Sequence, residues 1–151
     1  MADIDALDAY AADLIASLQP DARRELALRI AKELRPRNQK RIAAQTNPDG
    51  TPFEPRKPQL RHKTGKIKRQ MFSKLRTAKY LKATATENEA IVGFTREVSR
   101  IALVHHHGLR DRVNKKTGLE AKYPERQLLG IPDDDQALIA EIVTAHLADR
   151  L

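Results

Sequence analysis

Residues 81–94 read LKATATENEAIVGF, and this stretch decides the fold class. Apolar and polar residues alternate from Leu81 to Ala85 and again from Ala90 to Phe94, with Glu87-Asn88-Glu89 between the two runs. A period of two is typical of a half-buried strand, and a short polar connection between two such runs is typical of a turn. The stretch therefore predicts a β-hairpin.

A second alternating pair lies further along the chain, around residues 114–118, which read NKKTG. Leu109 and Val113 precede this turn, and Leu119 and Tyr123 follow it. This pattern predicts a second hairpin. We expect both hairpins to belong to one antiparallel sheet.

The N-terminal third of the chain has helical periodicity. Apolar residues recur at spacings of three and four from Ile4 to Leu18, which predicts an amphipathic helix over roughly residues 4–18. Pro20 suits the first turn of a second helix. Because proline removes a backbone donor and strains the preceding turn, we expect Pro36 to break or kink this helix near Leu34, and residues 38–45 to resume it.

Shorter helices are predicted in the middle of the chain and a longer one at its end. Ile67, Met71 and Leu75 are four residues apart, which favours a short amphipathic helix. Residues 99–107 predict a brief helix that ends at Gly108 as its C-cap. On this helix we expect three residues, Ile101, Val104 and His105, to face inward.

The C-terminal helix is expected to begin at Asp133-Asp134-Asp135, where the helix dipole favours acidic side chains. Residues 47–58 contain four prolines and the turn sequence Pro48-Asp49-Gly50, which predicts a stiff loop without helix or strand ladder.

These elements predict an α+β fold, an antiparallel sheet built from two β-hairpins with amphipathic helices at both ends and a Pro-rich loop. We expect a single domain over residues 1–151. Its parts are the N-terminal helices (1–46), the Pro-rich basic loop (47–64), the short helices and hairpins (65–132) and the C-terminal helix (133–151).

Composition excludes several classes of protein. The chain has 151 residues, a formal net charge of +8 and no cysteine, so disulfides, thiolate catalysis and cysteine-based metal sites are excluded. No apolar run approaches the ~20 residues that a membrane crossing requires. The acidic N-terminus lacks the features of a secretory signal or a transit peptide, which predicts a cytosolic protein.

The charge is unevenly distributed. Residues 1–22, 23–79, 80–132 and 133–151 carry net charges of −5, +14, +3 and −4. A concentration of positive charge attracts nucleic acid or an acidic protein surface. The alternative is that the acidic end helices fold back and neutralise part of the basic centre.

A cluster of cations within and after the Pro-rich loop is the candidate contact patch for DNA or a partner. Its residues are Arg56, Lys57, Arg61, Lys63, Lys66, Lys68 and Arg69. Only Phe53 and Phe72 lie near it, so base stacking is not supported, and a contact with DNA would be sequence-independent and made to the backbone. The alternative is a solvated face, or a face for an acidic partner subunit.

No catalytic, cofactor or metal site is predicted. His105-His106-His107 are consecutive on a predicted helix, so their side chains point in different directions and cannot share one ion. The glycines occur singly and form no phosphate-binding loop. Asp133-Asp134-Asp135 has the ordinary composition of a helix start. We therefore expect a protein that is not an enzyme.

Several motifs together resemble the phage virion morphogenesis family. The N-terminal ones are residues 41–45 (RIAAQ), 48–53 (PDGTPF), 55–57 (PRK) and 71–76 (MFSKLR), with Gly65 between the last two. The later ones are residues 92–94 (VGF), Ile101-Ala102, His105, Gly108, residues 123–126 (YPER) and 128–130 (LLG). His106-His107 depart from the family pattern, in which a Gln and a variable residue are expected.

The resemblance implies a structural role in the tail completion of contractile-tailed phages. It implies a small α+β subunit that finishes the tail tube as a homo-oligomeric ring, with a hexamer as the candidate stoichiometry, and makes the tail competent for head–tail joining. The implied partners are the tail tube protein and the head–tail connector proteins, with no cofactor and no membrane. The implied locations are the host bacterial cytoplasm during assembly and then the virion tail. The alternative function is sequence-independent DNA binding by the basic centre.

Overall fold

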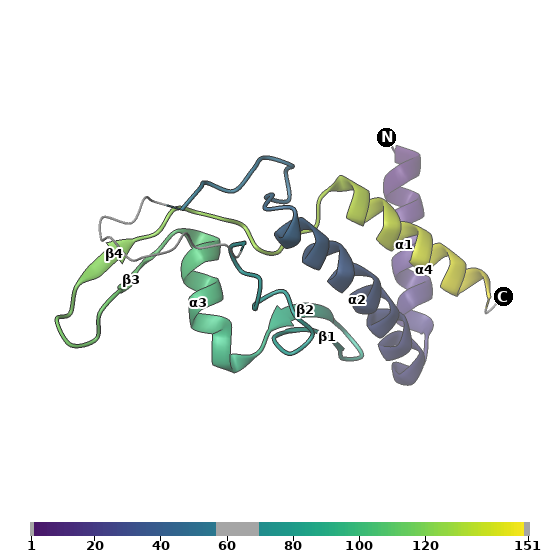
Figure 1. The fold of residues 1–151 in the computed structure, drawn as a ribbon. Coiled ribbons are helices and arrows are strands. Elements are labelled where there is room, and N and C mark those ends of the chain that lie inside the picture. Colours follow the sequence, from purple (N-terminus) through teal and green to yellow (C-terminus); the bar gives the residue numbers. More distant parts are fainter. Residues whose placement is uncertain (1, 57–69, 150–151) are drawn as a thin grey trace. The chain divides into compact units, whose positions relative to one another are not determined.

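The structure, a computed structural model, describes residues 2–56 and 70–149. In chain order these residues form α1 (Ala2–Ser17), α2 (Pro20–Ala43), β1 (Leu81–Ala85), β2 (Ala90–Phe94), α3 (Arg96–His107), β3 (Arg110–Arg112), β4 (Glu120–Lys122) and α4 (Asp133–Ala148), shown in Figure 1. This combination of helices and strands confirms the predicted α+β class.

The chain divides into two compact units. Unit 1 contains Met1–Leu34, Ala83–Val92 and Asp133–Leu151, and unit 2 contains Arg35–Lys82 and Gly93–Pro132. Both α2 and the β1–β2 hairpin contribute residues to each unit. Each unit is described by itself below, and the single-domain organisation stays a prediction.

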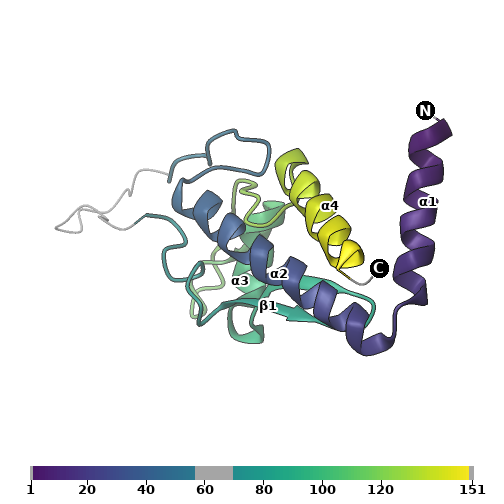
Figure 2. The same cartoon turned by 90° about the vertical axis from the view of Figure 1, so that its right-hand side faces the viewer.

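Both N-terminal helices are confirmed, but the predicted interruption of the second one is wrong. α2 runs without a break from Pro20 to Ala43 and contains Pro36 in its interior (Figure 2). Leu34, Asn38 and Ile42, which flank the proline, are all buried. Burial on both sides of Pro36 stabilises the helix and offsets the backbone hydrogen bond that the proline lacks.

Both hairpins are also confirmed, whereas the single sheet is wrong. Among the described residues, β1 pairs with β2 in one two-stranded sheet and β3 with β4 in another. In the second sheet, Arg110, Asp111 and Arg112 lie opposite Lys122, Ala121 and Glu120. β3 and β4 are short and highly charged, and such strands resist further pairing at their edges.

The predicted helix before Gly108 is confirmed as α3, and its cap has the expected geometry. Gly108 has φ 64° and ψ 51° and donates its N–H to the Val104 carbonyl. The predicted inward position of Ile101 is wrong, because its side chain is exposed. Val98 and Ala102 pack against the core of unit 2, so the buried face of α3 is rotated away from Ile101.

The segment around Met71 is not helical where the structure describes it. Ile67, the first residue of the predicted helix, lies outside the described residues, and residues 71–76 form successive turns. Phe72 has a positive φ of 64°. The Gln45 side chain donates to the Met71 carbonyl at 2.9 Å and accepts from the Met71 N–H at 3.2 Å, which removes both backbone groups from helical pairing.

The structure describes the Pro-rich loop as far as Arg56, and residues 57–58 lie outside the described residues. It was expected to lack any ladder, but it contains one isolated antiparallel bridge, between Thr46 and Pro52. The turn between them is held by Asp49, whose carboxylate accepts bonds from the Thr51 N–H and hydroxyl at 2.9 and 2.5 Å. These bonds lower the pKa of Asp49.

In unit 1, buried residues lie on α2 and α4. The first half of α2 buries apolar residues at spacings of one to four, namely Ala22, Leu26, Ala27, Ala31 and Leu34. α4 begins at the predicted Asp133 and buries Asp135, Ile142 and His146. Arg23 donates to the carbonyls of Ala16 in the last turn of α1 and of Glu87 in the β1–β2 turn, at 3.4 and 3.3 Å.

The core of unit 2 is assembled from five separate segments. Its buried members are Ile42, Phe53, Leu75, Ala102 and Leu128, and partly buried residues around them include Met71, Phe72, Phe94, Val98 and Leu129. The core therefore joins the end of α2, the Pro-rich loop, the turns at 71–76, α3 and the segment before α4.

Candidate functional site

The structure leaves most of the predicted basic patch undescribed. Arg56 is exposed at the end of the described part of the loop. The other six candidates, Lys57, Arg61, Lys63, Lys66, Lys68 and Arg69, lie outside the described residues. The patch therefore stays a prediction. The site that the structure does describe is a network of hydrogen bonds in unit 2, centred on Arg126.

Arg126 is the anchor of this network. Its side chain is 4 % exposed, and it donates to the carbonyls of Glu54 and Pro55 at 2.8 and 3.2 Å. Its own N–H donates to the His105 carbonyl at 2.8 Å. Burial lowers the pKa of Arg126, while the nearby Glu54 carboxylate raises it. Arg126 thus ties the segment before α4 to the Pro-rich loop and to α3.

The two residues after Arg126 make further bonds to distant segments. The Gln127 N–H donates to Oδ1 of Asn47 at 2.8 Å, and the Leu128 N–H donates to Nδ1 of His106 at 3.2 Å. The Leu128 side chain is fully buried in the core. A main-chain donor at Nδ1 requires that nitrogen to be unprotonated, so the bond selects the neutral imidazole.

Gly130 completes the network at α2. Its N–H donates to Oδ1 of the buried Asn38 at 3.1 Å, while Arg41 donates to that same oxygen at 2.7 Å and to the Gly130 carbonyl at 2.9 Å. A Cβ at Gly130 would overlap the Pro48 ring. Only glycine therefore allows the chain to pass this close to the loop.

Unit 2 also contains a row of aromatic rings. Phe53, Phe72, His105 and Tyr123 meet edge to face in sequence, with centroid distances of 5.8, 4.9 and 4.7 Å. Burial lowers the pKa of His105, repulsion from Arg126 lowers it further, and Asp111 acts in the opposite direction. Within the described residues, Nδ1 of His105 has no hydrogen-bond partner. His105 is thus a neutral packing residue.

The three histidines have different environments. His105 lies between rings, His106 accepts from Leu128, and His107 is exposed. No cluster of three metal-ligating side chains occurs in residues 2–56 and 70–149. The network side chains bond mainly to main-chain groups, so their chemistry is that of a scaffold.

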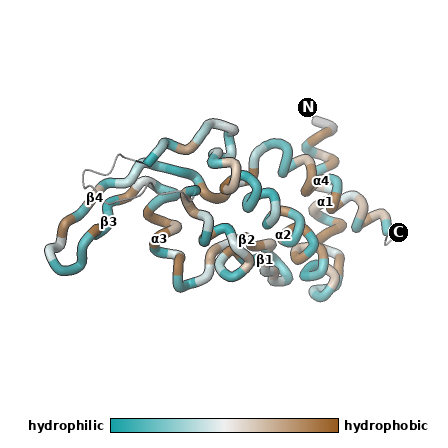
Figure 3. The backbone as a smooth tube through the Cα atoms, in the orientation of Figure 1, coloured by the Kyte–Doolittle hydropathy of each residue, from teal (hydrophilic) through white to brown (hydrophobic). Residues whose placement is uncertain are grey.

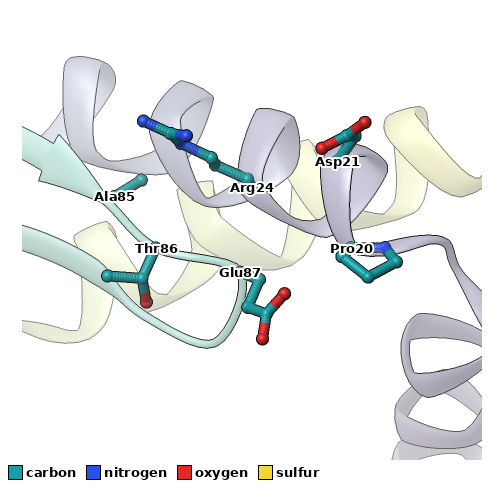
Figure 4. Close-up of a pocket in the computed structure, with 6 residues that line it drawn as sticks. All are labelled: Pro20, Asp21, Arg24, Ala85, Thr86 and Glu87. Atoms are coloured by element: carbon teal, nitrogen blue, oxygen red, sulfur yellow. The ribbon is translucent and has the colours of Figure 1, made fainter.

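Unit 1 contains an open pocket of about 380 Å³ between the start of α2 and the β1–β2 turn (Figure 4). Pro20, Asp21, Arg24, Ala85, Thr86 and Glu87 line it. The carboxylates of Asp21 and Glu87 point away from each other in Figure 4, so the pocket does not bring two acidic groups together. Asp135 of the acidic triplet is buried at the start of α4, whereas Asp133 and Asp134 are exposed.

Comparison with known families identifies the chain. Residues 2–148 match the phage virion morphogenesis family. The chain belongs to this family. It is also similar to the tail completion protein S of Escherichia phage P2, with 46 % identity over 136 residues that cover 89 % of this chain and 90 % of that protein. No solved structure matches the chain.

Family membership confirms the resemblance that the sequence motifs indicated. The structure adds that these motifs converge, since RIAAQ, PDGTPF, His105 and YPER contribute to the core and network of unit 2. Sequence reasoning missed the buried Asn38, which lies outside the family motifs, and the anchoring role of Arg126. No helix in the described part of the chain is long and apolar enough to span a bilayer.

Proposed function

We propose that this protein completes the phage tail. In this role it forms a homo-oligomeric ring at the head-proximal end of the tail tube, with a hexamer as the candidate stoichiometry, and makes the tail competent for head–tail joining. The proposal rests on family membership over residues 2–148 and on the similarity to the P2 tail completion protein.

One structural observation favours a scaffold role over an enzymatic one. The polar side chains of the family motifs bond to the chain's own backbone: Arg126 to Glu54 and Pro55, Gln45 to Met71, and Arg41 to Gly130. Groups used in this way rigidify a subunit, and a rigid subunit suits a protein that must fit between preformed assemblies.

The proposed partners are the tail tube protein and the head–tail connector proteins, together with further copies of this chain. Assembly in the host bacterial cytoplasm and residence in the virion tail are part of the same proposal. No cofactor and no catalytic step are proposed.

Deletion of the gene from the phage or prophage that carries it tests this function. We expect electron microscopy to show DNA-filled heads and separate tails of irregular length, and plaque assays to show no infectious particles. Addition of the purified protein to an extract of such cells should restore infectivity. Normal joined virions without the protein, or empty heads beside intact tails, would overturn the proposal.

Two variants of α4 make the complementation specific. Ile142→Asp places a charge at a buried position and should abolish rescue, because the subunit loses apolar packing. Ala140→Asp places the same charge at an exposed position of the same helix and should rescue like the wild type. Equal rescue by both variants would contradict a role for the folded subunit.

Sequence-independent DNA contact by the basic patch is the second candidate. The +14 net charge of residues 23–79 and the exposure of Arg56 favour it. An acidic surface of a neighbouring tail protein would satisfy the same cations, and salt-dependent binding to unrelated DNA duplexes distinguishes the two.

A further inference from the structure

The first half of α1 has an uncovered apolar stripe. Ile4, Leu7 and Tyr10 are 60, 66 and 62 % exposed, and Ala11 and Leu14 continue the helical spacing along the same side. Hydrophobic residues recur along this helix in Figure 3. A run of exposed apolar side chains on one helix face is typical of an interaction surface. We name these five residues the α1 stripe.

The charge of α1 restricts what can cover the stripe. The helix contains four aspartates and no basic residue. Two α1 helices packed on each other would bring these like charges together, which disfavours a symmetric pair of stripes. The complementary surface must therefore be apolar and surrounded by cations.

The β3–β4 hairpin has such a surface. Val113 and Leu119 are 57 and 63 % exposed, and the Val113 N–H donates to the Leu119 carbonyl at 2.8 Å, so the two residues lie opposite each other across the ribbon. Leu109 is also exposed, two residues before Asp111 on the same strand face. Hydrophobic and hydrophilic residues alternate along this hairpin in Figure 3.

Helix α3 extends this apolar surface. Arg100 forms an ion pair with Asp111 at 2.6 Å, which places that side of α3 against the strand face carrying Leu109 and Val113. Leu103 follows Arg100 by three residues, lies on the same side of α3 and is exposed. We name Leu103, Leu109, Val113 and Leu119 the hairpin surface.

The hairpin that carries this surface is rich in cations. Residues 109–123 contain five basic and two acidic residues. The basic ones are exposed, and they are Arg110, Arg112, Lys115, Lys116 and Lys122. One of the two acids, Asp111, is already paired with Arg100. Two basic hairpins would repel each other, as two acidic α1 helices would. An α1 helix and a hairpin, in contrast, attract each other.

We infer that the α1 stripe of one subunit docks on the hairpin surface of a second copy of this chain. The contact joins two different surfaces, so after the first contact forms one subunit keeps a free hairpin surface and the other keeps a free α1 stripe. Repetition of such a contact produces a closed ring when the rotation per subunit divides a full turn. This inference rests on the proposed function, because it supplies the subunit contact of the proposed ring.

Disulfide cross-linking tests the contact directly, because the chain has no native cysteine. A tagged Leu7→Cys chain is mixed with an untagged Leu119→Cys chain under mild oxidation, and the mixed dimer is measured by mass spectrometry. The matched control replaces Leu7→Cys with Ala9→Cys, an exposed position on the opposite side of α1. We expect at least tenfold more mixed dimer from Leu7→Cys.

Three results would overturn the inference. One is equal cross-linking from Leu7→Cys and Ala9→Cys, which would show that the stripe does not face the hairpin of a neighbour. Another is a disulfide that forms only when both cysteines are in one chain, which would make the contact intramolecular. A capture of Leu7→Cys by another tail protein in place of the second copy would equally refute it.

Charge reversal provides an independent measurement. Asp8→Lys on α1, which borders the stripe four residues after Ile4, or Lys115→Glu with Lys116→Glu on the hairpin, should each lower the oligomer fraction at least tenfold at low salt. Mixing the two reversed chains should restore contacts between unlike chains. If mixing the two reversed chains does not recover the oligomer, and the losses from the two reversals simply add, the inference is overturned.

The outcomes separate the two proposals. A ring that persists in Leu7→Asp and still restores infectivity would refute this contact and leave tail completion intact. Normal virions in the deletion strain would refute tail completion, whatever the cross-links show.

Discussion

The main-chain N–H of Leu128 donates to Nδ1 of His106 at 3.2 Å, across a sequence separation of 22 residues. His106 is where the resemblance led us to expect a Gln. The amide oxygen of a Gln is also an acceptor, so it can receive the same N–H. The hydrogen bond thus gives the departure from the family pattern a physical explanation.

This bond predicts that stability depends on pH. Burial lowers the pKa of His106, repulsion from His107 lowers it further, and Glu125 acts in the opposite direction. The unfolded chain therefore takes up a proton at higher pH than the native state does. As pH falls below about 6.5, the free energy of unfolding should decrease until the lower native pKa is passed.

Two substitutions at His106 separate titration from hydrogen bonding. His106→Gln keeps an acceptor, so it should retain stability at pH 7.5 and lose less stability on acidification than the wild type. His106→Ala leaves the Leu128 N–H without that acceptor and should cost about 1–3 kcal/mol at pH 7.5. Urea unfolding at pH 7.5 and 5 measures both effects, and an unchanged pH dependence in His106→Gln would refute the role of His106.

Arg126 is predicted to be the most sensitive cation in the described part of the chain. The lysine in Arg126→Lys lacks the planar guanidinium that donates to both the Glu54 and Pro55 carbonyls. We therefore expect this variant to lower the free energy of unfolding by about 2–4 kcal/mol. The exposed Arg110→Lys serves as the control and should stay within about 0.5 kcal/mol of the wild type. Similar midpoints for the two variants in urea unfolding would contradict an anchoring role.

Two glycines with positive φ separate backbone strain from steric overlap. Gly108 and Gly118 have φ of 64° and 69°, but a Cβ at Gly108 would lie 2.8 Å from the Glu125 nitrogen, while Gly118 faces open space. Gly118→Ala should cost about 1 kcal/mol from the left-handed conformation alone. Gly108→Ala should cost clearly more, and equal losses in thermal unfolding would refute the close approach.

The basic patch predicts steeply salt-dependent binding. If Lys63, Lys66 and Arg69 contact duplex DNA, each phosphate neutralised should contribute about −0.9 to the slope of log K against log salt. Charge reversal at these three positions should then weaken binding to all duplexes alike. Fluorescence anisotropy with two unrelated duplexes measures this. Affinity that persists in half-molar salt, or that differs strongly between the duplexes, would refute the DNA contact.

Local patterns predicted the elements that depend on neighbouring residues. Alternation predicted both hairpins, the three-and-four spacing predicted α1, Gly108 predicted the end of α3, and the three aspartates predicted the start of α4. Each of these signals acts over a few residues, so a single sequence contains it in full. The order and spacing of the motifs were sufficient to predict the family.

Contacts between distant segments decided the rest. α2 continues through Pro36 because buried residues on both sides stabilise it, and residues 71–76 form turns because Gln45 takes the backbone groups of Met71. The convergence of Asn38, Asn47 and His106 on residues 127–130 depends on hydrogen bonds between residues 22 to 92 positions apart. Sequence periodicity reports only which side of an element is apolar. Which distant groups satisfy its polar atoms is determined only when the folded chain brings them within hydrogen-bonding distance.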